Sequence, residues 1–298
     1  MDLSKVIIKN LEREDVSGIK AFLDVINSHD QLEMSIPEHD IEYILSHDEI
    51  RKDIFLTYLE DKIIGFAGCM RNVSQPQNAH FEVVIHPDYR QQGLGCKLYD
   101  IILGRAKDFD IKKGVAFAKE RMPQSVSFLQ NRDFKIDKYM WKMDLELKDT
   151  DYRKIPVEDW DIRLGTIEDN KDYVDIMNSG FKKEGEELYN EKSFIMMFGK
   201  ADRYIFFIEQ NSKLIATAAI SLQKDIDRGY IHNVTVYKDF RGKGFGEIAL
   251  SHCINIIKEA GLQKAALNVD GTNSNALNLY KKLGFVEKDT DIVFKLEL

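Results

Sequence analysis

The residues Arg241-Gly242-Lys243-Gly244-Phe245-Gly246 have the types and spacing of an anion-binding turn. They follow a β-branched run, Ile231 to Val236, which favours a buried strand, and they precede apolar residues at helical spacing. Glycines let a ligand approach the backbone closely, and the first N–H groups of a helix have no partner within it. The stretch therefore predicts a site for a phosphate or pyrophosphate. Because its glycines fit neither G-x-G-x-x-G nor G-K-[ST], an ordinary strand-to-helix connection is the alternative.

The amino-acid sequence around this turn indicates a protein family more specifically than the glycine spacing does. The sequence R-G-K-G-F-G after a V-x-V strand resembles the acyl-CoA pyrophosphate loop, [QR]-x-x-G-x-[GA], of the GNAT N-acetyltransferase superfamily. Asn273 to Phe285, N-S-N-A-L-N-L-Y-K-K-L-G-F, resembles the signature N-x-x-A-x-x-L-Y-x-x-x-G-F of the same family. The resemblance implies an α/β fold with a mixed sheet. It also implies transfer of an acetyl or other short acyl group from acetyl-CoA to a primary amine.

The resemblance further assigns contacts with acetyl-CoA. The backbone of the V-x-V strand would bind the pantetheine arm and polarise the thioester carbonyl, and the turn would bind the pyrophosphate. The asparagine that opens the second signature would also contact the cofactor, with a helix cap as its alternative role. The residues assigned in this way are Val234, Thr235, Val236, Arg241, Gly242, Lys243, Gly244, Phe245, Gly246, Glu247 and Asn273.

Acyl transfer to an amine needs one group that protonates the leaving thiolate and another that removes a proton from the amine. The family resemblance gives the first role to Tyr280, because a phenol has a reference pKa of about 10 and is protonated at pH 7. A buried core tyrosine is the alternative. Where many family members have a glutamate base, this chain has Tyr230, and His232 shares the same strand face. We expect His232 to relay the proton, with a purely structural histidine as the alternative.

The chain repeats itself at a spacing of 151 residues, as from Arg90 to Arg241 (241 − 90 = 151). The glycines of the two turns and several flanking segments align at the same spacing. Such agreement over several segments is typical of a tandem duplication. We therefore predict two tandem GNAT-like acyltransferase domains, a degenerate one at residues 1–148 and a catalytic one at residues 159–298.

The first half keeps the glycine turn as H-P-D-Y-R-Q-Q-G-L-G but loses the second signature. At its two catalytic positions it has Leu129 and Phe81, neither of which can transfer a proton. Two roles stay open for this half: it binds acyl-CoA, or it only supports the second half. If it binds acyl-CoA, the expected contacts are Ile85, Gln91, Gly93 and Gly95.

The composition narrows the class of protein. Of the 298 residues, 44% are hydrophobic and 31% are charged, as is usual for a soluble globular protein, and the net charge is −8. The negative charge argues against nucleic acid as a partner and mildly favours a cationic substrate. The three cysteines have no C-x-x-C spacing, and the sequence shows neither a signal peptide nor an apolar run long enough to span a membrane. These features predict a cytoplasmic protein with reduced thiols and no membrane contact.

The acceptor is less well defined by the sequence. An acidic stretch at residues 182–187, K-K-E-G-E-E, could attract a cationic amine, with a solvated loop as the alternative. We expect no metal, because neither H-E-x-x-H nor a histidine pair at i, i+4 spacing occurs. We expect a small-molecule amine as the acceptor. Transfer to a protein or peptide amine, and a non-catalytic role as an acyl-CoA sensor or scaffold, are the alternatives.

Overall fold

The structure, a computed structural model, describes residues 2–36, 38–147, 160–181, 188–198, 200 and 202–298. The chain forms two compact units. The first consists of Met1–Ala118, Pro123–Asp137 and Val293–Leu298, and the second of Lys119–Met122 and Lys138–Ile292. The expected link between the sequence halves and the acidic stretch at 182–187 lie outside the described residues.

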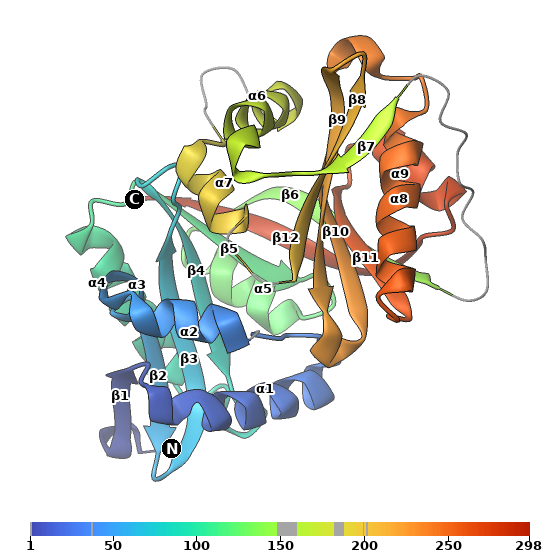
Figure 1. Ribbon diagram of the computed structural model, residues 1–298. Helices are drawn as coiled ribbons and strands as arrows, with labels where there is room; N and C mark the ends of the chain where they lie inside the picture. Colours follow the sequence, from blue (N-terminus) through green and yellow to red (C-terminus); the bar gives the residue numbers. More distant parts are fainter. Residues whose placement is uncertain (1, 37, 148–159, 182–187, 199, 201) are drawn as a thin grey trace. The chain divides into compact units, whose positions relative to one another are not determined.

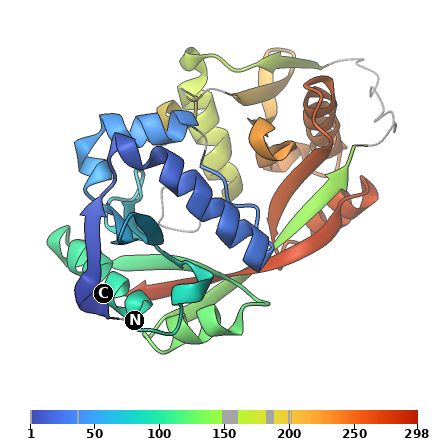
Figure 2. The ribbon, with the colours of Figure 1, turned by 90° about the horizontal axis from the view of Figure 1, so that it is seen from below.

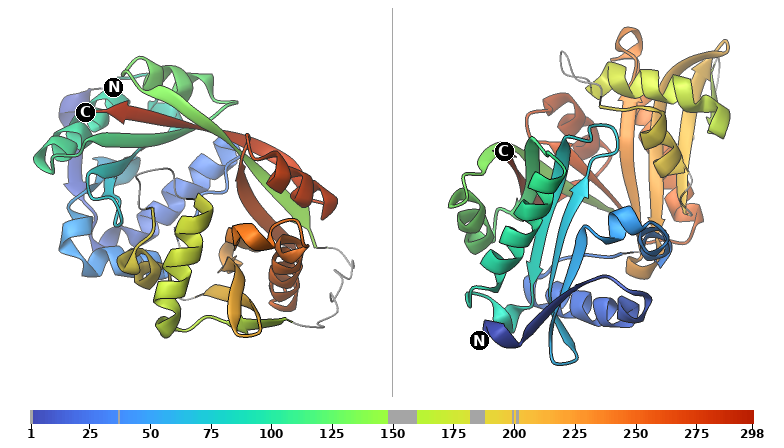
Figure 3. Two further views of the ribbon diagram at one scale, coloured as in Figure 1. Left: turned by 90° about the horizontal axis from the view of Figure 1, so that it is seen from above. Right: turned by 90° about the vertical axis from the view of Figure 1, so that its left-hand side faces the viewer.

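The first unit is a mixed sheet with helices on both faces. Its strands are β1 (Val6–Asn10), β2 (Ile54–Leu59), β3 (Lys62–Arg71), β4 (Asn78–Ile85), β5 (Lys113–Lys119) and the end of β12 (Val286–Glu297). Its helices are α1 (Val16–Asp30), α2 (Glu38–Ser46), α3 (Asp48–Arg51), α4 (Leu94–Asp108) and α5 (Pro123–Gln130). The strand order is β1-β2-β3-β4-β5-β12. Helix α4 covers one side of β2–β4, and α1 and α2 cover the other (Figure 3, right).

The second unit has the same arrangement. Its strands are β6 (Lys135–Glu146), β7 (Asp161–Leu164), β8 (Arg203–Gln210), β9 (Lys213–Gln223), β10 (Arg228–Val236), β11 (Lys264–Asp270) and the start of β12. Its helices are α6 (Asn170–Phe181), α7 (Glu191–Phe198), α8 (Phe245–Glu259) and α9 (Ser274–Lys282). The strand order is β12-β6-β11-β10-β9-β8-β7. Helices α6 and α7 lie on one side of β8–β10, and α8 and α9 lie on the other (Figure 1).

The elements confirm the repeat and the mixed α/β class that the sequence predicts. Helices α4 and α8 each have 15 residues and begin at residues 94 and 245, a spacing of 151 residues. Strands β6 and β12 each have 12 residues at the same spacing. The strands extend beyond the apolar runs that indicated them. In β12 the run begins at Ile292, but the strand begins at Val286, because its first residues are mostly exposed and carry no apolar signal.

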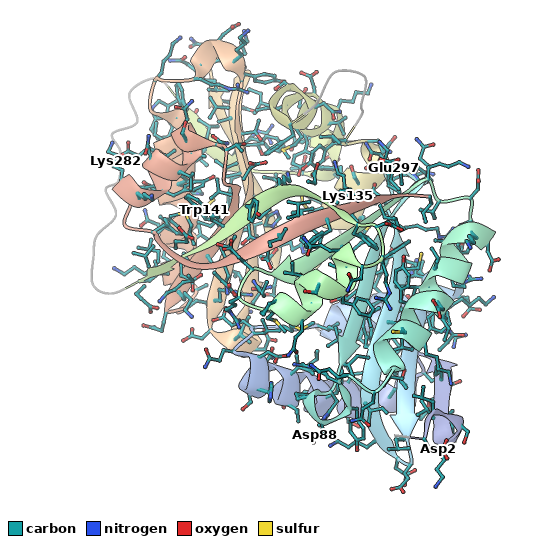
Figure 4. The ribbon with its side chains drawn as sticks, turned by 180° about the vertical axis from the view of Figure 1, so that it is seen from behind. Asp2, Asp88, Lys135, Trp141, Lys282 and Glu297 are labelled. Atoms are coloured by element: carbon teal, nitrogen blue, oxygen red, sulfur yellow. The ribbon has the colours of Figure 1, made fainter. Side chains whose placement is uncertain are left out.

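Each compact unit contains a terminal strand from the other half of the sequence. Strand β6 closes the first half, yet it pairs with β11 of the second unit along Lys264–Asp270. Conversely, the last residues of β12, Val293–Leu298, belong to the first unit. Figure 4 labels Lys135 at the start of β6 and Glu297 at the end of β12, and Figure 2 shows β12 as one continuous strand. The compact units therefore differ from the two sequence halves at this pair of strands.

Strand β10 has different neighbours on its two faces. Ile231 is buried in the cluster that includes α8, and a Cβ atom added to Gly229 would lie 2.3 Å from Ile257 of α8. Because side chains alternate along a strand, Tyr230 and His232 point to the opposite face, where α6 and α7 pack. This alternation separates Tyr230 and His232 from the side chains that pack against α8.

The close approach of β10 to α8 predicts the effect of one added methyl group. Gly229→Ala is expected to lower the free energy of unfolding by about 1–3 kcal/mol, because it overpacks this contact. Gly104→Ala on α4 is the matched control, since nothing lies within 4 Å of a Cβ atom there. It should be neutral or stabilising by up to about 1 kcal/mol. Urea denaturation of both variants measures this, and equal free energies would contradict the packing.

Candidate active site

The parallel strands β10 and β11 part in the middle of the second unit. Their hydrogen-bonded register covers only Arg228–Tyr230 of β10, and the last pair is Tyr230 with Ala266. On the other side, β10 stays paired with β9 as far as Val236. In the described part of the second unit, the backbone of Ile231–Val236 thus has one edge without a strand partner. An extended ligand with amide groups can bind to such an edge.

A β-bulge lies on the same segment of β10. His232 pairs with Ala219 and Thr235 pairs with Thr217, so that β10 has one residue more than β9 between these pairs. Asn233 in the bulge has a φ of 55°, and its side-chain amide donates a hydrogen bond to the Tyr173 hydroxyl at 2.7 Å. A bulge bends a strand and changes the direction of the backbone groups that follow. In β10 the bulge changes the direction of the backbone groups of the V-x-V residues, among them Val234.

The glycine turn after β10 has an open backbone. Gly242 and Gly244 have φ angles of 76° and 90°, and nothing lies within 4 Å of a Cβ atom at either position. Gly244 is the N-cap of α8, so the free N–H groups at the helix start are next to open space. The Arg241 Nε atom donates to the Val236 carbonyl oxygen at 2.9 Å, which ties the turn to the end of β10. The turn therefore fits a pyrophosphate.

The remaining residues assigned to this turn have other contacts. Lys243 Nζ lies 5.1 Å from the centre of the Phe240 ring, and Glu247 accepts a hydrogen bond from Lys282 Nζ at 2.6 Å. Phe245 is buried, so it can offer a ligand only its backbone N–H. A Cβ atom on Gly246 would lie 3.2 Å from a methyl group of Leu279 on α9. Gly246 thus has a packing role that its place in the motif does not reveal.

Asn273 and Tyr280 lie at opposite ends of α9. Asn273 is its N-cap, and the side-chain oxygen accepts from the Ala276 N–H at 3.1 Å, so the helix-cap role is present in the structure. Tyr280 is half-buried, and burial raises its pKa to about 12. Burial also raises the pKa of Tyr230, and the Tyr280 phenol contributes a smaller part of that rise. Both phenols are therefore protonated at pH 7.

His232 lies on the face of β10 opposite α8. Its Nε2 atom is 3.0 Å from the Ser221 hydroxyl oxygen, and its ring lies 6.3 Å from that of Tyr230. Burial, with a smaller contribution from Arg203, lowers the pKa of His232 to about 4. The imidazole is thus neutral at pH 7 and can accept a hydrogen bond or pass on a proton, although its low pKa makes it a weak base. Sequence reasoning missed Ser221, because cross-strand pairing is not visible in a single sequence.

One expectation about the first unit is wrong. By register, Gly68 of β3 pairs with Glu82, whereas the equivalent Ala219 of β9 pairs with His232. The counterpart of His232 is therefore Glu82 and not Phe81, because the bulge adds one residue to β10 and the β3–β4 register has no shift. Glu82 is half-buried, and burial raises its pKa. The first unit thus has a carboxyl group where the second has an imidazole.

The glycine turn of the first unit has the expected backbone but different surroundings. Gln91 and Gly93 have φ angles of 57° and 86°, and Gly93 is the N-cap of α4. The guanidinium of Arg90 makes a bidentate ion pair with the buried Asp30. Leu3 of the N-terminal 3-10 turn (Leu3–Lys5) lies 3.4 Å from the position of a Cβ atom on Gly93. The N-terminal segment therefore packs against this turn, which leaves less room for a ligand than in the second unit.

The other positions expected to contact acyl-CoA in the first unit are Ile85 and Gly95. The Ile85 carbonyl oxygen accepts from Arg90 Nε at 3.0 Å, as Val236 does in the second unit. A Cβ atom on Gly95 would lie 3.4 Å from the Phe128 ring. Leu129, the counterpart of Tyr280, is buried. Arg90 ties its turn to its strand as Arg241 does, but no proton donor occupies the tyrosine position.

Two features of the described residues concern metals and membranes. Within this part of the chain, no three His, Cys, Asp or Glu side chains gather as a metal-ligand set. None of the helices there combines the length and apolar character needed to cross a bilayer. The absence of a metal and the cytoplasmic location stay predictions.

The strand edge, the glycine turns and the repeated sheet define the class of protein. The sequence model of the acetyltransferase (GNAT) family matches residues 23–134 and 170–285, which together make up more than half of the chain. The chain therefore belongs to the GNAT family, with two GNAT domains in tandem. It is an acetyl-CoA-dependent N-acetyltransferase.

Relatives of known activity and solved structures agree with this class. The chain is 25% identical over 271 residues to mycothiol acetyltransferase of Nocardiopsis dassonvillei, and the match covers 79% of each chain. It is 33% identical over 100 residues to the ribosomal protein bS18-alanine N-acetyltransferase of Escherichia coli, which covers 33% of this chain and 65% of that one. The two-copy layout, with an altered first copy, also resembles that of mycothiol synthase.

Two solved structures share the fold along almost the whole chain. A GCN5-related N-acetyltransferase from Sphaerobacter thermophilus has a TM-score of 0.78 at 15% identity, covering 98% of this chain and 96% of that one. A tandem GNAT protein from the clavulanic acid biosynthesis pathway has a TM-score of 0.75 at 13% identity, covering 98% of each chain. At such identities the likeness establishes the fold and nothing about substrates.

The lowered pKa of His232 predicts a dependence of stability on pH. An exposed histidine titrates near pH 6.5, so the unfolded chain binds more protons than the folded chain between about pH 6.5 and 4. The stability linked to this residue is therefore fully present above about pH 6.5 and is lost as the pH falls toward 4. From about pH 7 to 4.5, His232→Gln should lose less unfolding free energy than the wild-type chain in urea denaturation. Equal losses would contradict a buried, neutral imidazole.

Proposed function

We propose that the second unit transfers the acetyl group, or another short acyl group, from acetyl-CoA to a primary amine. The observation that carries this proposal is the bulged free edge of β10, which occurs in the same unit as an open glycine turn and Tyr280. The first unit has a similar free edge, since β4 and β5 pair only over Asn78–His80 of β4. It has neither the bulge nor the tyrosine.

The residues of the second unit would divide the work as follows. The open N–H groups at the start of α8 would bind the pyrophosphate, and the free edge of β10 would bind the amide groups of the pantetheine arm. A backbone N–H of Val234–Val236 would polarise the thioester carbonyl. As the nitrogen–carbon bond forms and the carbon–sulfur bond breaks, Tyr280 would give its proton to the sulfur. The proton released by the amine would leave by way of His232 or water.

The comparisons favour a small-molecule acceptor over a protein amine. The mycothiol acetyltransferase of Nocardiopsis dassonvillei matches along 79% of this chain, whereas the bS18-alanine N-acetyltransferase matches along 33%. The two-domain arrangement is thus shared with the former. For the first unit, we propose a supporting role without catalysis, because the Arg90–Asp30 ion pair and Leu3 occupy the surroundings of its glycine turn.

A matched pair of glycine variants tests which turn binds acetyl-CoA. Gly244→Ala forces a side chain into the left-handed region at a cost of about 1–2 kcal/mol and should raise the KM for acetyl-CoA roughly tenfold. Gly93→Ala imposes the same strain on the first unit, where φ is 86°. It should leave this KM unchanged. Initial rates over a range of acetyl-CoA concentrations give both values, and a larger effect of Gly93→Ala would overturn the assignment of the turn.

A second pair of variants tests which unit performs the chemistry. Tyr280→Phe removes only the phenolic oxygen and should lower kcat by on the order of 100-fold, because the thiolate then leaves without its proton donor. Glu82→Gln removes the ionisable group at the first unit's counterpart of His232 and should leave kcat unchanged. Release of free CoA thiol measures both rates. Loss of activity in Glu82→Gln with normal activity in Tyr280→Phe would move catalysis to the first unit.

A further inference from the structure

A row of polar side chains crosses three neighbouring strands of the second unit. Arg203 of β8 lies directly opposite Ser221 of β9, and Ser221 lies directly opposite Tyr230 of β10. Residues that are directly opposite in a sheet project to the same face. Arg203 therefore shares a face with Tyr230, which occupies the usual position of the family's base.

The row also includes His232, whose imidazole contacts the Ser221 hydroxyl at 3.0 Å. The charge of Arg203 helps to lower the pKa of His232, after burial, which agrees with a guanidinium on the same face. Ile205, two residues after Arg203, packs in the cluster formed with α6 and α7. Because side chains two residues apart share a face, this contact fixes the direction of Arg203 independently of the pKa.

Arg203 differs from a neighbouring arginine in its lack of an acidic partner. Arg163 of β7 is held by Asp169 and Glu209, with nitrogen–oxygen distances of 2.7 Å to each carboxylate. Asp202, next to Arg203 in the sequence, instead pairs with Lys224 at 3.1 Å. Within the described part of the chain, no carboxylate lies within ion-pair distance of the half-buried Arg203. A partly desolvated cation is costly unless it has a counter-charge.

A guanidinium is well suited to bind a planar anion. It offers N–H groups in a fixed fork that matches the two oxygens of a carboxylate. On this face it lies one strand beyond Ser221, on the side away from β11. A ligand that joins an amine to a carboxylate by a few bonds could thus place the amine near Tyr230 and the carboxylate on Arg203.

We propose that Arg203 binds a carboxylate of the acceptor, and that the acceptor is therefore an amino acid or a related amine that bears a carboxylate. This inference rests on the proposed transfer in the second unit. It deepens that function by naming the chemical class of the acceptor, and it makes Arg203 the residue that sets specificity.

The test uses the full chain with acetyl-CoA and three matched pairs of amines: L-phenylalanine and phenethylamine, L-serine and ethanolamine, and L-lysine and cadaverine. The release of CoA thiol gives kcat/KM for each. The wild-type enzyme should prefer the carboxylate-bearing member of at least one pair by roughly tenfold or more. Arg203→Ala should remove that preference by lowering only the rate with the carboxylate-bearing amine, and Arg203→Lys should keep part of it.

Lys224→Ala is the matched control, because it removes a nearby positive charge that already has an acidic partner. It should retain the preference, which excludes a general effect of net charge. Thermal denaturation of each variant shows whether it folds. An equal loss with both members of every pair in Arg203→Ala would overturn the proposal while leaving the transfer in place. So would a wild-type enzyme that prefers the amines without a carboxylate.

A binding measurement separates this inference from the proposed function. If no amine of the panel is acetylated, the transfer to these amines fails. The carboxylate site is then judged by isothermal titration of L-phenylalanine, L-serine and L-lysine into the wild-type and Arg203→Ala proteins. Binding that is at least roughly tenfold weaker in the variant supports the site. Equal binding, or no binding to either protein, overturns it.

Discussion

The candidate site depends on the early end of hydrogen bonding between β10 and β11. After Tyr230 and Ala266, the two parallel strands no longer satisfy each other's backbone groups. Buried N–H and C=O groups need partners, so an unpaired edge inside a sheet is stable only if another chain segment, water or a ligand supplies them. The bulge at Asn233 and the glycine turn after Val236 lie on the same segment. One interruption of the sheet thus places the strand edge and the glycine turn next to each other.

The two units share one backbone plan but differ in the side chains at equivalent positions. The glycine turns and the helices that follow them coincide in position and length. The differences are local: one inserted residue in β10, an ion pair at Arg90 in place of an open turn, and Leu129 in place of Tyr280. Because side-chain chemistry, and not the fold, decides whether a site can transfer a proton, a copy of the fold can be kept while its activity is lost or changed.

Burial keeps two ionisable groups of the candidate site in their neutral forms. Tyr280 stays protonated and His232 stays unprotonated at pH 7, because desolvation disfavours the charged form of each. Such a setting also favours the neutral form of an amine, which is the form that attacks a thioester. Arg203 and Arg228 remain charged on this face, since a guanidinium keeps its proton under all ordinary conditions, and the Arg228 guanidinium lies 5.8 Å from the centre of the Tyr230 ring. Neutral side chains with fixed cations beside them form a setting that can select a ligand by charge.

The sequence by itself determined the family, the mixed α/β class, the repeat and the glycine turns. These features depend on residues that lie close together in the chain, such as Arg241 to Gly246. They also depend on periodic apolar residues, which any fold of this class must bury. The order of the elements followed for the same reason. The ends of strands such as β12 did not, because exposed strand residues carry no apolar signal.

Only the tertiary structure decided the relations between segments far apart in the sequence. It placed β6 beside β11, set Ser221 against His232, and aligned Arg203 with Tyr230. It also showed that the counterpart of His232 in the first unit is Glu82 and not Phe81. A gapless alignment of the two halves cannot detect the bulge, since the extra residue of β10 becomes visible only from the hydrogen bonds with its partner strand. Strand register is fixed by the packing of whole faces, and a shift of one residue turns each side chain to the other side of the sheet.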